Sequence, residues 1–313
     1  MFSCVAENDA HWFRMVQNLV VSVRRTGGAL ASAPFVVNVV GALDAIWDDL
    51  RAWDVELRVV QRVMPERATF NKLRMFELAA THDFDTLIVS DCDIVILGDL
   101  SPYVMPEALG VVPAIRHRHS AADWERAYAA FGIPVPETRV VSTVSGELGF
   151  PYYNGGFLIA RRGMCEPVRE RWFTLGKEIF RRCEADPHFL EKPPGDQISL
   201  ALAIADLGIT VDQMPLNVNM TTRAERFAAE YDGDWGPPFV LHYHDYIGPD
   251  GFLLRSPNPR TARQCDAFNR LRAETLGVRY RGMKPKETKV AAFRRRAKRR
   301  WRRLAGRAAE APS

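Results

Sequence analysis

Short apolar runs alternate with helix-patterned stretches along the first 60 residues. The apolar runs are Phe2–Ala6, Pro34–Val40 and Val55–Val60. Between them, apolar residues recur at helical spacing in Ala10–Arg25 and in Ala42–Trp53. The order strand, helix, strand, helix, strand predicts parallel pairing, because parallel strands need crossover connections.

The same alternation continues beyond this point. A helix predicted at Asn71–Ala80 leads into Thr86–Ser90, whose nearly unbroken apolar character is typical of a central strand buried on both faces. Ser120–Gly149 is expected to be a loop-rich insertion. Further strands and helices are predicted at Gly156–Ala160, Val168–Phe180, Gln197–Asp206 and Phe239–Tyr243. The fold class is therefore α/β, with a mostly parallel, Rossmann-like central sheet flanked by helices.

Composition is that of a soluble globular protein, with 47% hydrophobic and 26% charged residues. No apolar run is long enough to cross a bilayer, and the start lacks the pattern of a secretory signal. The five cysteines are odd in number and scattered, which argues against a disulfide framework or a cysteine zinc site. A reducing compartment, and hence the cytoplasm, is expected.

Charge divides the chain into two parts. Residues 284–313 hold 12 Lys and Arg against two acids, whereas the rest holds 30 basic and 36 acidic residues. We expect a domain at 1–282 and a basic tail at 283–313. In the tail, Phe293, Ala297, Trp301 and Leu304 would line one side of a basic amphipathic helix, which is typical of attachment to an anionic membrane. A disordered tail and nucleic-acid contact are the alternatives, and nucleic acid is the least favoured.

Two aspartates follow the central strand in the segment FDTLIVSDCDIVIL. Ligands of open α/β sheets bind beyond the carboxyl ends of strands, and residues i and i+2 of an extended backbone project to the same side. Asp91 and Asp93 could therefore converge on a divalent cation such as Mn²⁺ or Mg²⁺, which would hold diphosphate oxygens. The alternative is a pair of ordinary surface aspartates in a turn.

Five segments in order carry a family resemblance: FNKLRMFEL, FDTLIVSDCDIVIL, YYNGGFLIARR, GDQISLALA and FVLHYH. Over about residues 2–248 the chain resembles the GT-A fold and, more closely, glycosyltransferase family 8, which contains glycogenin and bacterial lipopolysaccharide galactosyltransferases. The resemblance implies a metal-dependent hexosyltransferase that uses a UDP-sugar donor with retention. The acceptor would be a saccharide or glycolipid, which suits an enzyme on the inner face of the cell membrane. The stretch Ser120–Gly149 would then be a mobile insertion that faces the acceptor.

The resemblance also implies a ligand set. Asp91 and Asp93 would bind Mn²⁺ and the UDP diphosphate, with a histidine of the late strand as third ligand. His242 and His244 both match this position, and their spacing would place them on the same face of the strand. His242 is preferred, because it ends an apolar strand and precedes an aromatic residue.

Other donor contacts follow from the resemblance. Lys72 matches a lysine that holds the donor, although a solvated helix face is the alternative. Asn154, Gly155 and Gly156 match an N-x-G segment beside the sugar, where a tight turn is the alternative.

The end of the first strand, at Ala6 and Glu7, matches the place of uracil and ribose contacts in the family. Cys92, between the two aspartates, joins the predicted donor contacts.

Asp196 and Gln197 match the family's Asp-Gln pair and are the predicted catalytic residues. Asp196 would bind sugar hydroxyls, and Gln197 would present its carbonyl oxygen to the developing positive charge at the anomeric carbon. An N-cap at the start of the next helix is the alternative role of Asp196.

One family element is missing. The metal histidine is usually followed by Gly and then Lys-Pro-Trp, whose Lys contacts phosphate. Here the next basic residue is Arg255, so either Arg255 replaces the lysine or the phosphate contact differs.

Two other functions remain in view. A nucleotide-sugar pyrophosphorylase would show a basic, Gly-rich loop after the first strand, where this chain has AENDAHW. A non-catalytic sugar- or nucleotide-binding module is less favoured, because the carboxylates and Gln197 are all present.

Overall fold

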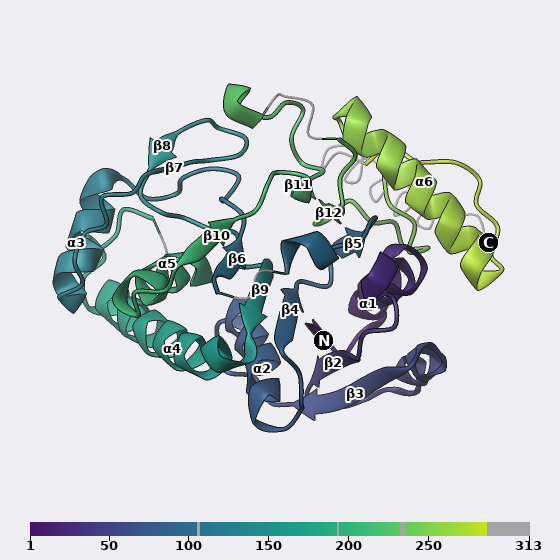
Figure 1. The fold of residues 1–313 in the computed structure, drawn as a ribbon, viewed down its shortest axis with the longest axis horizontal. Coiled ribbons are helices and arrows are strands. Elements are labelled where there is room, and N and C mark those ends of the chain that lie inside the picture. Colours follow the sequence, from purple (N-terminus) through teal and green to yellow (C-terminus); the bar gives the residue numbers. More distant parts are fainter. Residues whose placement is uncertain (105–106, 193, 232–235, 287–313) are drawn as a thin grey trace, which may run out of the picture.

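A seven-stranded sheet forms the centre of the protein (Figure 1). The computed structural model describes residues 1–104, 107–192, 194–231 and 236–286. Strands lie in the order β10-β6-β9-β4-β1-β2-β3. Their bounds are β1 Phe2–Glu7, β2 Phe35–Val40, β3 Val55–Val60, β4 Thr86–Ser90, β6 Leu109–Val111, β9 Phe157–Arg161 and β10 Val211–Gln213.

The predicted parallel pairing is confirmed. β1 pairs in parallel with β2 and β4, and β2 pairs in parallel with β3. β9 runs antiparallel to both of its neighbours, β4 and β6. The mostly parallel sheet therefore brings the carboxyl ends of β1, β2 and β4 to one edge.

Helices flank this sheet. Their bounds are α1 Ala10–Thr26, α2 Leu73–Phe76, α3 Ala121–Phe131, α4 Arg162–Ala185, α5 Asp196–Asp206 and α6 Pro259–Leu276. Short 3₁₀ turns lie at Gly28–Leu30, Ala45–Trp53, Ala68–Lys72, Glu77–Ala80, Ser101–Tyr103 and Ala229–Tyr231. Two expected helices therefore differ in type: the one predicted at Ala42–Trp53 is a 3₁₀ helix, and the one at Asn71–Ala80 is a single α turn between two 3₁₀ turns.

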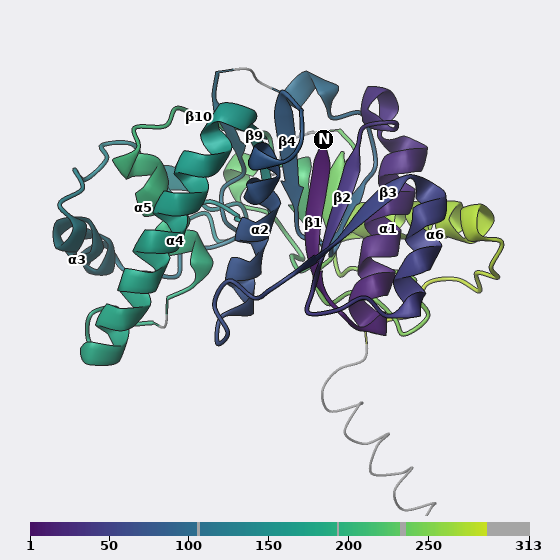
Figure 2. The same cartoon turned by 90° about the horizontal axis from the view of Figure 1, so that it is seen from below.

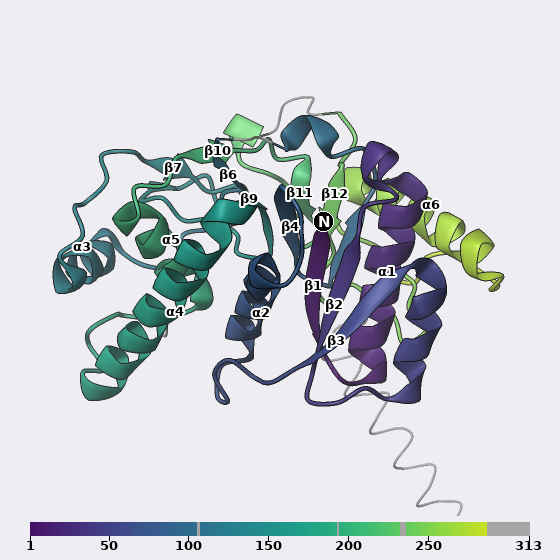
Figure 3. The same ribbon diagram turned by 60° about the horizontal axis from the view of Figure 1, so that its bottom comes forward.

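Alternating strand residues build two cores, one on each face. In β4, Leu87 and Val89 pack with α2, α4 and α5, whereas Ile88 packs with α1 and α6. This is the period of two expected of a strand whose side chains point to opposite faces. Figures 2 and 3 show α3, α4 and α5 on one side of the molecule and α1 and α6 on the other, with β1 and β4 between.

A second, three-stranded sheet joins distant parts of the chain. It has the order β11-β12-β5, with β5 at Ile94–Ile96, β11 at Val218–Thr221 and β12 at Val240–His242. β12 runs antiparallel to β5, and its register places His242 opposite Ile94. The last residue of β12 is thereby brought next to the segment that contains Asp93.

The expectation for Ser120–Gly149 is wrong in part. This stretch contains α3 and a small antiparallel hairpin of β7 (Val140–Val141) and β8 (Leu148–Gly149). α3 begins at a capping box in which Ser120 and Asp123 each accept a hydrogen bond from the other's backbone N–H.

The predicted membrane-binding helix, with Phe293 and Trp301, lies outside the described residues. Among the helices that the structure does describe, none is both long enough and apolar enough to cross a bilayer.

Candidate active site

A cleft of about 440 Å³ opens at the carboxyl ends of the parallel strands. Glu7 at the end of β1, Val40 at the end of β2 and Asp91 after β4 all line it. This is the edge at which open α/β sheets bind their ligands. Several residues predicted from the sequence are brought together here, namely Ala6, Glu7, Lys72, Asp91, Cys92, Asp93 and His244.

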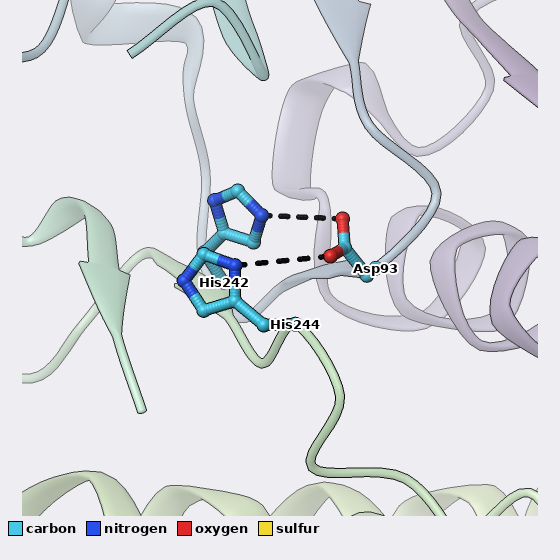
Figure 4. Close-up of side chains that lie close together, drawn as sticks. All are labelled: Asp93, His242 and His244. Atoms are coloured by element: carbon cyan, nitrogen blue, oxygen red, sulfur yellow. Dashed lines mark ion pairs between the residues drawn. The ribbon is translucent and has the colours of Figure 1, made fainter. Parts of the chain in front are cut away.

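Asp93 lines this cleft and faces two histidines, of which His244 also lines the cleft and His242 is buried (Figure 4). His242 Nε2 lies 3.1 Å from one carboxylate oxygen of Asp93, and His244 Nδ1 lies 3.8 Å from the other. The two imidazole rings stack with their centroids 3.8 Å apart. Both histidines thus face Asp93, whereas the resemblance required only one.

Local backbone structure explains this arrangement. The Tyr243 N–H donates to the Asp93 carbonyl at 2.9 Å, which continues the β12–β5 pairing past the strand end. β12 ends at His242, and His244 adopts a left-handed conformation with φ of 52°. The ring of His244 therefore reaches Asp93 from a turn, although the sequence suggested strand alternation.

Burial and charge set the protonation of this group. Burial alone would raise the pKa of Asp93, but the adjacent His242 outweighs burial and holds that pKa well below its usual range. Burial, together with the neighbouring His242, lowers the pKa of His244 to about 2. At neutral pH, Asp93 is therefore an anion beside a neutral His244 imidazole.

These three residues fit a divalent cation. Asp93, His242 and His244 each offer one ligand atom, and these atoms lie within 4.8 Å of one another. A carboxylate with two imidazoles suits Mn²⁺ and related ions. Thr221 Oγ1 lies 2.9 Å from His244 Nε2, so the ring nitrogen that faces away from Asp93 is held in place.

Asp91 points to a different partner. Lys72 Nζ lies 3.3 Å from Asp91 Oδ1 and 3.0 Å from Asp196 Oδ2, and it donates to the Gly155 carbonyl at 3.1 Å. The expectation of two converging aspartates assumed an extended backbone, whereas Cys92 and Asp93 lie in a turn. The turn aims Asp91 at Lys72 and Asp93 at the histidines.

Lys72 links the cleft to Asp196, which does not line it. Its side chain is only 10% exposed, which excludes the alternative of a solvated helix face. Burial alone would lower the pKa of Lys72, but the carboxylates of Asp196 and Asp91 outweigh it and raise that pKa above its usual value. Lys72 is therefore a fixed cation between two acids.

The N-x-G segment lies next to Asp91 and forms hydrogen bonds and close contacts there. The Asn154 side-chain oxygen accepts from the Gly156 N–H at 2.8 Å, and its amide nitrogen lies 3.5 Å from His242 Nδ1. The Gly156 carbonyl accepts from the Asp91 N–H at 2.6 Å. A Cβ on Gly156 would lie 2.3 Å from Asp91 Oδ2, so a larger residue here would displace the Asp91 carboxylate.

Asp196 and Gln197 open α5. The N-cap is Gly195, and Asp196 is already the first helical residue, so the N-cap role considered for Asp196 is wrong. The Asp196 carbonyl accepts from Trp172 Nε1 at 2.7 Å and from the Ser199 hydroxyl at 2.8 Å. These contacts leave the Asp196 carboxylate directed at Lys72, with half-buried Gln197 next along the helix.

Two further residues predicted to contact the donor, Glu7 and Arg255, already have partners within the protein. Glu7 lines the cleft, but its carboxylate already pairs with Arg62 at 2.7 Å and accepts from Asn71 at 3.2 Å. Arg255 is exposed and does not line the cleft, and its N–H donates to the Lys284 carbonyl.

Sequence reasoning missed Arg223. This residue lines the cleft just after β11 and lies 3.4 Å from Asp245. The segment TTRAERF holds two arginines, and nothing in their spacing would have singled out Arg223.

Comparisons with known proteins agree with this geometry. A family model described as a Rhodobacterales glycosyltransferase domain matches residues 18–208. No curated protein matches the chain.

Solved structures resemble the chain at low sequence identity. An active-site mutant of LgtC is 15% identical, with a TM-score of 0.50 over 88% of this chain and 96% of that one. The galactosyltransferase LgtC with donor and acceptor sugar analogues is 16% identical, with a TM-score of 0.49 over 88% and 96%. The glycosyltransferase GlyE of Streptococcus pneumoniae is 14% identical, with a TM-score of 0.48 over 92% and 67%. The first likeness confirms the predicted fold.

Proposed function

Because the chain belongs to the Rhodobacterales glycosyltransferase domain family, we propose that it moves a hexose from a UDP-sugar to a saccharide or glycolipid acceptor, with retention and with a divalent metal. The observation that carries the proposal is the facing of Asp93 by His242 and His244, with Asp93 and His244 lining a cleft at the carboxyl ends of the strands. Lys72, which also lines this cleft, pairs with Asp196.

Asp93, His242 and His244 would hold the ion, which we propose to be Mn²⁺ or Mg²⁺. When bound, the ion supplies positive charge that stabilises the departing diphosphate. Asp91, beside Lys72, remains a proposed ligand of the ion and contact of the diphosphate. We propose that Arg223 faces the diphosphate in place of Arg255, because Arg223 lines the cleft.

The sugar would lie between Asn154, Gly155 and Asp196. The Asp196 carboxylate, fixed by Lys72, is suited to accept hydrogen bonds from sugar hydroxyls. Gln197 would offer its carbonyl oxygen to the positive charge that develops at the anomeric carbon. Ala6, Glu7 and Cys92 would contact the nucleoside, since all three line the inner part of the cleft.

A donor panel tests the function. Purified full-length chain with Mn²⁺ should release UDP from at least one UDP-hexose, and EDTA should abolish this release until Mn²⁺ is restored. UDP release that EDTA leaves unchanged would contradict the metal requirement. Turnover of a sugar 1-phosphate with a nucleoside triphosphate, in place of UDP release, would favour the pyrophosphorylase.

The histidines are tested by metal affinity. His242→Ala and His244→Ala should each weaken Mn²⁺ binding about tenfold or more. Loss of even an outer-shell partner of a metal ligand has an effect of this size. Free Mn²⁺ measured by electron paramagnetic resonance during titration reports this affinity. His188→Ala, at an exposed histidine, is the matched control and should bind as the unsubstituted chain does. Unchanged affinity in His244→Ala would leave His242 as the single imidazole ligand.

A further inference from the structure

A second cleft of about 440 Å³ lies beside the N-terminus of α3 and the β7–β8 hairpin. In Figure 1 these elements lie on the α5 side of the molecule, away from α1 and β3. The cleft is lined mainly by charged and aromatic residues, including His117, Arg118, His119, Arg139, Phe150 and Lys192. The proposed donor site uses none of them.

Arg118 connects this cleft to the sugar side of the donor site. A guanidinium nitrogen of Arg118 lies 3.8 Å from where a Cβ on Gly195 would be. Gly195 immediately precedes Asp196, whose carboxylate lies 3.0 Å from Lys72 Nζ. A molecule in the second cleft would therefore reach toward the proposed position of the transferred sugar.

Hydrogen bonds anchor the backbone around the second cleft. On the side of Arg118, the Ala114 N–H donates to the Tyr152 carbonyl at 2.9 Å, and the Thr143 N–H donates to the Ala114 carbonyl at 3.0 Å. On the side of Lys192, the Glu191 N–H donates to the Asp123 carboxylate at 3.0 Å. The segments that carry Arg118 and Lys192 are thus anchored, so binding a ligand mainly orders their exposed side chains.

The cations of this cleft differ in how they are engaged. Arg139 donates to the Pro136 carbonyl at 2.6 Å and packs its guanidinium over the Phe150 ring, 4.2 Å from the centroid. Arg118 and Lys192 are exposed, and neither has a hydrogen bond or ion pair with any residue that the structure describes. Two cations are therefore available to a ligand.

Acids also line the cleft. The charge that a ligand would meet beside the proposed sugar position therefore depends on where each acid and each cation lies. Glu147 accepts from the Ser145 hydroxyl at 2.9 Å, and Glu191 accepts from the Ser120 hydroxyl at 3.3 Å. Glu125 lines the cleft from the exposed side of α3 and, like Arg118 and Lys192, has no hydrogen bond or ion pair with a residue that the structure describes. The group beside Gly195 is the guanidinium of Arg118, which suits bidentate contact with a carboxylate or phosphate.

His119 offers a further polar group at the cleft. Its side chain is 0% exposed, and neither ring nitrogen has a hydrogen-bond partner among the described residues. The nearest carboxylate, that of Asp123, is 3.8 Å from Nδ1, which is beyond hydrogen-bond distance. A buried polar group without a partner is costly, and a ligand or water that enters would satisfy it.

We propose that this second cleft binds the acceptor, and that Arg118 and Lys192 make the enzyme prefer an acceptor saccharide that carries a carboxylate or phosphate. The inference rests on the proposed transferase function, because it takes the cleft beside Asp196 to be the acceptor side. Shape alone would admit a neutral saccharide. The two unengaged cations are what select an anionic one.

Binding of matched probes tests the inference. Methyl β-glucuronide, glucose 6-phosphate and methyl β-glucoside are titrated by ligand-observed NMR, with Mn²⁺ and saturating UDP present so that the donor cleft is filled. The anionic probes should bind about tenfold more tightly than the glucoside, in line with the strength of charge-assisted hydrogen bonds. A response to glucuronide alone identifies a carboxylate ligand, and a response to glucose 6-phosphate alone identifies a phosphate.

Variants locate the effect. Arg118→Gln should remove most of the preference, and Arg118→Lys should restore part of it. Arg116→Gln is the matched control, since Arg116 is exposed two residues away and does not line the cleft. Equal affinity for the charged and neutral probes would overturn the inference, and so would equal losses in Arg116→Gln and Arg118→Gln. Failure of UDP itself to bind would instead count against the proposed function.

Discussion

Asp93→Asn is expected to lower UDP release by about a thousandfold, which is the scale of losing one group that stabilises charge in the transition state. The amide keeps the shape of the carboxylate but removes the anion that His242 and His244 face. Mn²⁺ affinity should fall with activity, so both are measured on the same preparation by coupled UDP assay and metal titration.

The control for this variant is another aspartate. Asp83→Asn alters a carboxylate that is 100% exposed and pairs with Arg162 at the surface, so its activity should stay near that of the unsubstituted chain. Full activity in Asp93→Asn, with the fold intact by circular dichroism, would remove Asp93 from the metal site.

Lys72→Met is expected to cost about 3–5 kcal/mol of folding stability at pH 7, the range for removing one partner of a buried ion pair. Asp91 and Asp196 would lose their shared cation, at positions where their side chains are 29% and 12% exposed. Urea unfolding measures the loss. Lys177→Met, at an exposed lysine, should change stability by less than about 0.5 kcal/mol.

The pH dependence of this loss has a definite sign. The folded-state pKa of Lys72 is raised, so its contribution is present throughout the neutral range and is lost only as pH rises through that pKa. The pKa of Asp91 is also raised, chiefly by burial, and losing Lys72 would raise it further. Protonation then relieves the unpaired charge, so the stability deficit of Lys72→Met should shrink between pH 7 and pH 5. A deficit that grows toward pH 5 would contradict this account.

The sheet was predictable because strands such as Phe35–Val40 and Thr86–Ser90 are nearly continuous apolar runs. Val55–Val60 and Thr86–Ser90 have the bounds expected from the sequence, and their parallel neighbours follow from the crossover rule. The position of Asp91 and Asp93 beyond a central strand was predictable for the same reason. A nearly unbroken apolar run is typical of a strand that is buried on both faces, and polar residues that follow the run are then expected beyond the carboxyl end of that strand.

The partners of the two aspartates were predictable only in part. The resemblance gave His242 or His244 as a partner of the aspartate pair, and both histidines face Asp93. The separation of Asp91 from Asp93 depends on a turn at Cys92, and the second imidazole depends on the left-handed backbone of His244, and neither has a signal in the residue types. Of the second cleft, the sequence indicated only that Ser120–Gly149 could face an acceptor. One wall of this cleft begins with the capping box of Ser120 and Asp123. The sequence indicates this capping box, because S-x-x-D precedes a segment with apolar residues at helical spacing.

The pairing of β12 with β5 determines the stage of folding at which the site can form. Tyr243 donates its hydroxyl to the Cys92 carbonyl across 151 positions of sequence. A contact of such long range closes a large loop, and large loops close slowly. During synthesis, the segment around Asp93 emerges long before His242 and His244, so the nascent enzyme would gain its imidazoles only after the long intervening segment has been made.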